Sequence, residues 1–145
     1  MAENGKSAIF AEVEAMLGQV PHWVRAMPDA ALGGFWSFMR DFELAETKIP
    51  NKYKELIALG VSGATRCKYC ALFHTEAARL FGATDEEIAE ASMMAGVTMC
   101  ASTFLNAQQT DYETFRKETL EIAEFVKKQQ KAKTTTTKSA PRAHA

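Results

Sequence analysis

Residues 55–74 read ELIALGVSGATRCKYCALFH, and this stretch decides the fold that we predict. Apolar residues recur in it at helical spacing and enclose two cysteines, a histidine and a glutamate. Pro50 suits the first turn of a helix that runs to about Ala64. A glycine-containing bend then precedes Cys67, where a second helix begins and continues to Gly82, a favourable helix-ending residue. We therefore predict two consecutive helices joined by a tight turn.

Three reactive side chains of the second helix share one face. At about 100° per residue, Cys67, Cys70 and His74 lie within roughly 60° of one another around the helix axis. Cys70 is one turn from His74, whereas Cys67 is about 10 Å from it along the axis. His74 is therefore predicted to deprotonate Cys70, and Cys67 to form a disulfide with Cys70. The helix N-terminus also favours a thiolate at Cys67.

Glu55 joins this group if the two helices fold back on each other. It then lies roughly 15 Å before the turn and His74 about 13 Å after it, at similar heights on adjacent helices. A carboxylate there could orient and polarise the imidazole, directly or through a water, as the third member of a catalytic triad does. The alternative is a solvent-exposed glutamate beside Lys52 and Lys54, since charged residues are mostly exposed.

The rest of the chain has helical periodicity and no sustained strand alternation, which predicts an all-α fold of about six helices. An apolar stripe runs from Leu32 to Phe42. Capping boxes at residues 84–87 and 110–113 open two further helices, the first of them rich in small residues. These apolar surfaces exceed what one subunit can cover, so we expect a homo-oligomer.

Charge is unevenly distributed along the chain. Residues 127–145 carry six basic residues and no acid, which leaves a net charge of −7 on residues 1–126. We expect residues 1–126 to form a single helical domain and residues 127–145 a basic, disordered tail. The acidic body argues against nucleic acid as a partner. Neither a signal peptide nor an uncharged apolar run of about 18 residues is evident, so no membrane is expected and cytoplasm is the predicted compartment.

The Cys-x-x-Cys pair has two interpretations in a cytoplasmic protein, a redox centre and a metal site. Zinc is the serious alternative, but it needs a fourth ligand, and Cys100 or His22 would have to supply it. Covalent haem in its usual form is excluded, because Ala71 rather than histidine follows the second cysteine. We therefore predict a redox-active pair that uses no metal and no cofactor.

The pattern as a whole resembles a known family. Glu55 within KELIALGVS, followed by Cys67, Cys70 and His74, is similar to the core of the AhpD-like alkylhydroperoxidases in the carboxymuconolactone decarboxylase superfamily, over about residues 30–110. The resemblance implies an all-helical fold assembled as trimers or hexameric rings. It implies that Cys70 is the peroxidatic cysteine and Cys67 the resolving one. It further implies a proton relay through Glu55 and His74.

Two features depart from that pattern. The best-known members carry a histidine immediately before the second cysteine, where this chain has Tyr69, whose phenol could take part of the relay. They are also longer, so this chain resembles the short, single-core form. We expect a thiol-dependent alkyl hydroperoxide reductase, an antioxidant of the peroxiredoxin type, with a small hydroperoxide as substrate and an external dithiol or disulfide reductase as partner. The alternative is a redox-sensing or disulfide-exchange module without significant peroxidase turnover.

Overall fold

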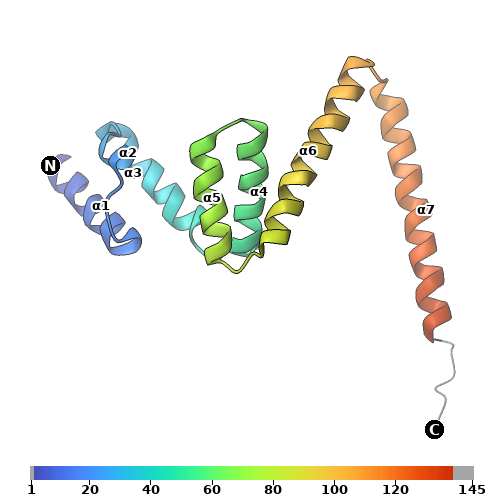
Figure 1. The fold of residues 1–145 in the computed structure, drawn as a ribbon, viewed down its shortest axis with the longest axis horizontal. Helices are drawn as coiled ribbons and strands as arrows, with labels where there is room; N and C mark the ends of the chain where they lie inside the picture. The colour runs from blue at the N-terminus through green and yellow to red at the C-terminus, as the bar shows by residue number, and fades with distance from the viewer. Residues whose placement is uncertain (1, 139–145) are drawn as a thin grey trace, which may run out of the picture. The chain divides into compact units, whose positions relative to one another are not determined.

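The computed structural model describes residues 2–138, with side chains from 5 to 132, and is helical throughout (Figure 1). No strand occurs within residues 2–138, so the predicted all-α class is confirmed. The expected six or so helices become seven α-helices and one π-helical turn. The elements are α1 (Ala2–Leu17), α2 (His22–Arg25), α3 (Asp29–Phe38), η1 (Met39–Glu43), α4 (Asn51–Ala64), α5 (Lys68–Leu80), α6 (Asp85–Ala107) and α7 (Tyr112–Lys138).

The chain divides into two compact units, Met1–Thr98 and Met99–Ala145. The first unit holds α1 to α5 and most of α6, and it contains the whole reactive stretch of residues 55–74. The second unit holds the end of α6 and all of α7. A single domain over residues 1–126 stays a prediction.

A small apolar core lies between α1, α2 and α3. Gly18 adopts a φ of 77° directly after the end of α1, a conformation that glycine takes readily. The Glu12 carboxylate connects α1 to α3 and to the π-helical turn η1. It accepts hydrogen bonds from Trp36 Nε1 at 3.0 Å and from Arg40 Nη1 at 2.8 Å. The buried core residues are Val13, Val20, Val24, Leu32, Trp36 and Met39.

Helix α3 changes into the π-helical turn η1 at Met39. The Leu44 N–H donates to the Met39 carbonyl, five residues earlier, at 2.9 Å. The wider turn changes which side chains face the core. Phe42, expected on the buried stripe, is exposed and stacks against Phe38 with ring centroids 5.3 Å apart. Glu43, one residue later, is partly buried instead.

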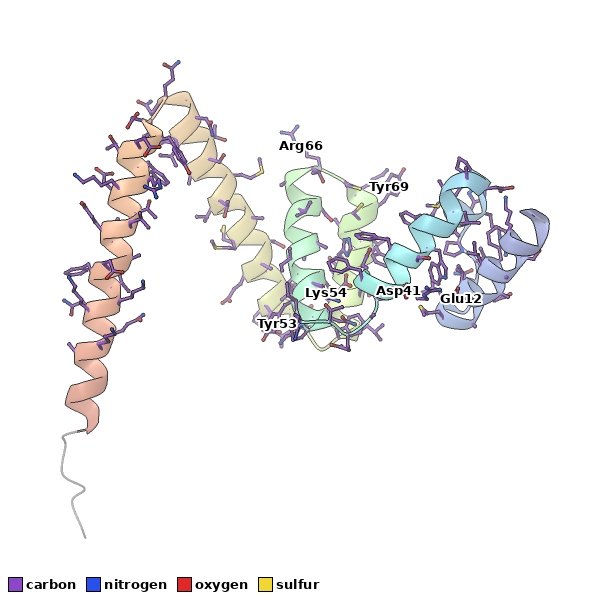
Figure 2. All side chains as sticks on the ribbon, turned by 180° about the vertical axis from the view of Figure 1, so that it is seen from behind. Glu12, Asp41, Tyr53, Lys54, Arg66 and Tyr69 are labelled. Atoms are coloured by element: carbon purple, nitrogen blue, oxygen red, sulfur yellow. The ribbon has the colours of Figure 1, made fainter. Side chains whose placement is uncertain are left out.

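Helices α4 and α5 lie side by side as an antiparallel hairpin (Figure 1). Arg66 sits in the turn with a φ of 57°, and its side chain points outward at this end of the hairpin (Figure 2). The Cys67 N–H donates to the Ser62 carbonyl at 3.0 Å, which closes the turn. Cys67 is the N-cap of α5, and Gly82, with a φ of 83°, follows its end, so both predicted helices are confirmed. The buried face of α4 consists of Asn51, Glu55, Leu59 and Ser62.

Helix α6 begins at the predicted capping box. The Thr84 N–H donates to Glu87 Oε2 at 2.9 Å, and the Glu87 N–H donates back to Thr84 Oγ1 at 3.2 Å. Gly60 of α4 faces α6 closely, since a Cβ added there would lie 3.4 Å from the Cβ of Ala95. The small residues predicted to allow close helix approach therefore do so at this contact.

Helix α7 differs from the prediction at both ends. Its first turn is capped by Asp111, which accepts from the Thr114 N–H at 2.8 Å, and not by the predicted box at residues 110–113. The expected disorder from residue 127 onward is wrong for residues 127–138, which continue the helix. Lysine, glutamine and alanine dominate residues 127–133, and all three have high intrinsic helix propensity. Residues 139–145 of the predicted tail lie outside the described residues.

Helix α6 presents an unusual amount of exposed apolar surface, since none of its residues is buried. It is also the one helix in the described part of the chain that is long and apolar enough to cross a membrane by length and composition. The sequence predicted no such span, because acidic residues interrupt the first turns of this helix. Core and interface helices of soluble proteins pass the same criterion. The large exposed apolar residues of this helix are Met93, Met94, Val97, Met99 and Phe104.

Candidate active site

The centre of the site is a pair formed by Glu55 on α4 and His74 on α5. The Glu55 Oε2 lies 2.7 Å from His74 Nδ1, the length of a charge-assisted hydrogen bond. The side chain of Glu55 is 1% exposed and that of His74 is 13% exposed, so the alternative of a solvent-exposed glutamate is wrong. A carboxylate that accepts the Nδ1 proton leaves Nε2 as the basic nitrogen of a neutral imidazole. The pair is therefore arranged to make His74 a base.

The two thiols of the Cys-x-x-Cys pair lie next to each other at the start of α5. The two sulfur atoms are 2.8 Å apart, and the Cys70 N–H also donates to the Cys67 sulfur at 3.3 Å. Both are free thiols; Cys67 is partly buried and Cys70 is exposed. As N-cap, Cys67 accepts one of the backbone N–H groups that the first turn of a helix leaves unpaired. The predicted proximity of the two sulfurs is present in the structure.

The contact between the thiols separates their pKa values. Hydrogen bonds from the side chain and backbone N–H of Cys70 lower the pKa of Cys67. The same side-chain contact raises the pKa of Cys70, with burial and the negative charges of Cys67 and Glu43 adding to the effect. The contact therefore favours a thiolate at Cys67 over one at Cys70 in the reduced pair. His74 forms no hydrogen bond with either sulfur in the described part of the chain, so the predicted proton transfer from Cys70 has no direct contact in this state.

Tyr69, the predicted auxiliary residue, points away from the pair. Its side chain is 76% exposed, and the Lys68 ammonium lies 5.2 Å from the centre of its ring. Figure 2 shows it projecting outward from the start of α5. No hydrogen bond within residues 5–132 joins the phenol to the histidine or to a sulfur, so the phenol does not replace a relay histidine in this conformation.

The zinc alternative finds no ligand set in the structure. Cys100 and His22, one of which would have to supply the fourth ligand, are both exposed. Among the described residues, one group of three potential ligands is close enough to hold a metal ion, and it contains neither of these residues and no cysteine. That group joins Glu43 to the Glu55–His74 pair, with the ligand atoms all within 4.8 Å of one another.

Sequence reasoning missed Glu43. The residue lies in η1, and the burial of its carboxyl group raises its pKa; electrostatic interactions with His74 and Lys54 oppose that shift and the charge of Glu55 adds to it. A signal was present, since position 43 continues the helical spacing of Trp36 and Met39, where a charged residue is out of place. The stripe was instead extended to the neighbouring phenylalanine, because the π-helical turn leaves no mark in the sequence.

Fold and site together define a helical thiol protein with a Cys-x-x-Cys pair beside a buried carboxylate–imidazole pair. A sequence profile of the carboxymuconolactone decarboxylase family matches residues 30–108, more than half of the chain. The chain therefore belongs to the carboxymuconolactone decarboxylase family, and the resemblance seen in the motif is confirmed.

Two known proteins are similar to most of this chain. The crystal structure of the alkylhydroperoxidase AhpD core from Rhodospirillum rubrum matches with a TM-score of 0.67 and 30% identity, covering 76% of this chain and 85% of that one. A Paracoccus denitrificans protein described as uncharacterized protein 4 in the cox locus is 28% identical over 98 residues, which are 68% of this chain and 84% of that protein. The fold of this chain is thus AhpD-like.

Proposed function

We propose that this protein is a thiol-dependent alkyl hydroperoxide reductase. The observation that carries the proposal is the buried Glu55–His74 pair, joined at 2.7 Å, on a hairpin that also holds two thiols 2.8 Å apart, of which Cys70 lies one helical turn before His74. A base, a group that orients it and two neighbouring thiols are the parts that a two-cysteine peroxidase needs. The similarity to the structure named alkylhydroperoxidase AhpD core supports the same reading.

In the proposed reaction His74 accepts the Cys70 proton, and the Cys70 thiolate attacks the terminal oxygen of a small hydroperoxide. A sulfur–oxygen bond forms as the oxygen–oxygen bond breaks, and the departing alkoxide takes the proton from His74 and leaves as the alcohol. Cys67 then attacks the sulfenic acid, which releases water and forms the disulfide. An external dithiol returns two electrons and two protons by thiol–disulfide exchange, directly or through a disulfide reductase.

The separated pKa values of the thiols fit this order of events. A lowered pKa at Cys67 makes it a ready thiolate for resolving the sulfenic acid, and a good leaving group during reduction of the disulfide. The raised pKa of Cys70 explains why a base is needed, because this thiol stays protonated beside the Cys67 thiolate. The two sulfurs are 2.8 Å apart, so the one remaining proton of the pair can pass from Cys70 to Cys67. This transfer turns a Cys67 thiolate into a Cys70 thiolate.

Peroxide consumption with a dithiol tests the proposal, using wild type, Cys70→Ser and Cys67→Ser. We expect Cys70→Ser to abolish turnover, and Cys67→Ser to stop after one equivalent and leave a sulfenic acid at Cys70 that dimedone traps. Cys100→Ser is the matched control, because this exposed thiol lies outside the pair, and it should behave as wild type. Equal activity of all four proteins would refute the proposal. A sulfenic acid trapped at Cys67 in the Cys70→Ser variant would instead make Cys67 the peroxidatic cysteine and Cys70 the resolving one.

A second candidate is disulfide exchange with a partner protein, without peroxidase turnover. The exposure of Cys70 and Tyr69 favours it, since a large partner can reach the thiols from this end of α5. Reduction of a protein disulfide at a rate far above that of peroxide consumption would support this function over the first.

The assembly is proposed to be a homo-oligomer, a trimer or a hexamer, acting in the cytoplasm. The exposed apolar residues of α6 would be covered by other copies of the chain. Multi-angle light scattering tests this assembly, and a monomer at micromolar concentration would contradict it.

A further inference from the structure

One oxygen of the buried carboxylate in the site has no partner. Glu55 Oε2 is bonded to His74, but Oε1 is buried and accepts no hydrogen bond from any described residue. An unsatisfied buried acceptor of this kind is unfavourable and uncommon. It also leaves the carboxylate held at one oxygen only, so that nothing else fixes the orientation on which the bond to His74 depends.

The carboxyl group of Glu43 lies near this pair, within 4.8 Å of both partners. Glu43 and Glu55 form no direct hydrogen bond. A separation of up to about 5 Å between two polar atoms is one that a single water molecule can span with two hydrogen bonds. Glu43 is therefore close enough to the Glu55 carboxylate for a water-mediated contact.

The backbone around Glu43 is held in place by side chains of α4. Lys54 Nζ donates to the Phe42 and Ala45 carbonyls, at 2.7 Å each. Asn51 Nδ2 donates to the Leu44 carbonyl at 2.9 Å. Three carbonyls on either side of Glu43 are thus tied to the same helix that carries Glu55, and Figure 2 shows Lys54 between this helix and η1. These contacts fix the π-helical turn over the site.

Four charged or titratable groups face Glu43: Glu55 and Lys54 from α4, and His74 and Cys70 from α5. Burial raises the pKa of the Glu43 carboxyl group, which favours its neutral form, a hydrogen-bond donor. Its ionised form raises the pKa of Cys70 and so opposes the thiolate there. The protonation state of Glu43 therefore bears on both members of the relay.

We propose that Glu43 is a positioning residue of this site: its neutral carboxyl group donates to Glu55 Oε1, directly or across one water, and so holds Glu55 in the orientation that bonds His74. This proposal rests on the proposed roles of Glu55 and His74 in activating Cys70. The alternative is a divalent cation bound by Glu43, Glu55 and His74. The 2.7 Å hydrogen bond between Glu55 Oε2 and His74 Nδ1 counts against it, because it points this ring nitrogen at the carboxylate and not at an ion.

The experiment measures the rate at which iodoacetamide alkylates Cys70 in a Cys67→Ser/Cys100→Ser background, at intervals of roughly half a pH unit from about pH 5 to about pH 10. This rate reports the Cys70 thiolate and needs no peroxidase activity. Glu43→Ala removes the donor and should lower the rate at neutral pH by about fivefold to tenfold, the usual effect of one hydrogen bond. Glu43→Gln keeps a donor and should retain the neutral-pH rate, while any inflection due to Glu43 disappears from its pH profile. Glu46→Gln, an exposed acid in the following loop, is the control.

The outcomes separate the possibilities. Profiles of Glu43→Ala and Glu43→Gln that both match the background would overturn the proposal, and so would an equal loss in both, because a donor would then not be what matters. Stoichiometric binding of zinc or manganese to the wild type that Glu43→Gln abolishes, measured by titration calorimetry, would overturn it in favour of a cation site. If the alkylation profiles change as expected and no peroxide is consumed, the positioning role stands and the proposed peroxidase function fails.

Discussion

Replacing Glu55 by glutamine keeps the size of the buried side chain and removes its charge. The amide N–H of Gln would donate to His74 Nδ1, so the imidazole would carry its proton on Nε2 and lose its basic nitrogen. The substitution thus reverses the tautomer that the 2.7 Å hydrogen bond selects. Hydrogen bonds to charged groups contribute about 1.5 to 3 kcal/mol, which corresponds to a rate change of about 10-fold to 150-fold. We expect Glu55→Gln to slow both Cys70 alkylation and peroxide reduction by an amount in this range.

Glu76→Gln provides the matched control. This glutamate also lies on the hairpin and pairs with Arg79, but the pair is exposed, so its loss should leave both rates unchanged. The double variant Glu55→Gln/His74→Gln should be no slower than His74→Gln alone, because the two residues act as a unit. Circular dichroism of each variant confirms that the hairpin is folded. A Glu55→Gln rate within about twofold of the wild type would refute the view that this pair activates the thiol.

Four further outcomes are expected. Cys70→Ala should raise the pKa of Cys67, because it removes the largest cause of its lowering, so alkylation of Cys67 should require a higher pH; an unchanged profile counts against the thiol contact. The free energy of unfolding of the wild type should fall relative to that of Glu43→Gln as the pH rises from about 4.3, the pKa of glutamate in the unfolded chain, through the raised pKa of Glu43 in the folded protein. Urea unfolding at about pH 4 and about pH 8 measures this difference, and a difference that does not change with pH contradicts the burial of that carboxyl group. Thr84→Ala should lower the free energy of unfolding by about 1 kcal/mol, the effect of a lost N-cap, and no change in the urea midpoint would argue against the capping box. Val97→Asp places a charge on the exposed apolar face of α6 and should reduce the mass seen by light scattering, whereas an unchanged mass would place the interface elsewhere.

The hairpin and the contact between Glu55 and His74 were predictable from the sequence because they depend on local rules. Helical periodicity, a proline at one end and a glycine at the other bounded α4 and α5. Helical rise and rotation then placed Glu55 opposite His74, and the structure joins them. Such inferences need only residues close in sequence and regular helical geometry.

What the sequence did not reveal depends on irregular backbone and on tertiary contacts. The π-helical turn shifts Phe42 to the surface and brings Glu43 toward Glu55, and no residue type at Met39 signals such a turn. The position of Cys67 at a helix N-terminus already favoured a thiolate there. The contact between the two sulfurs, which lowers the pKa of Cys67 and raises that of Cys70, was not part of that reasoning. The extension of α7 beyond residue 127 reflects intrinsic propensity without packing, which a search for apolar faces overlooks.

The position of Cys67 at the start of α5 links oxidation of the thiols to the stability of a helix end. In the reduced state its sulfur accepts the Cys70 N–H, and a thiolate there faces the positive end of the helix dipole. Disulfide formation removes that charge, so the helix stabilises the reduced form and shifts the pair toward a more oxidising reduction potential. Each 1.4 kcal/mol of such stabilisation raises the potential by about 30 mV. In the proposed reaction, the capping residue of one helix would therefore help to determine which dithiols are able to reduce the Cys67–Cys70 disulfide.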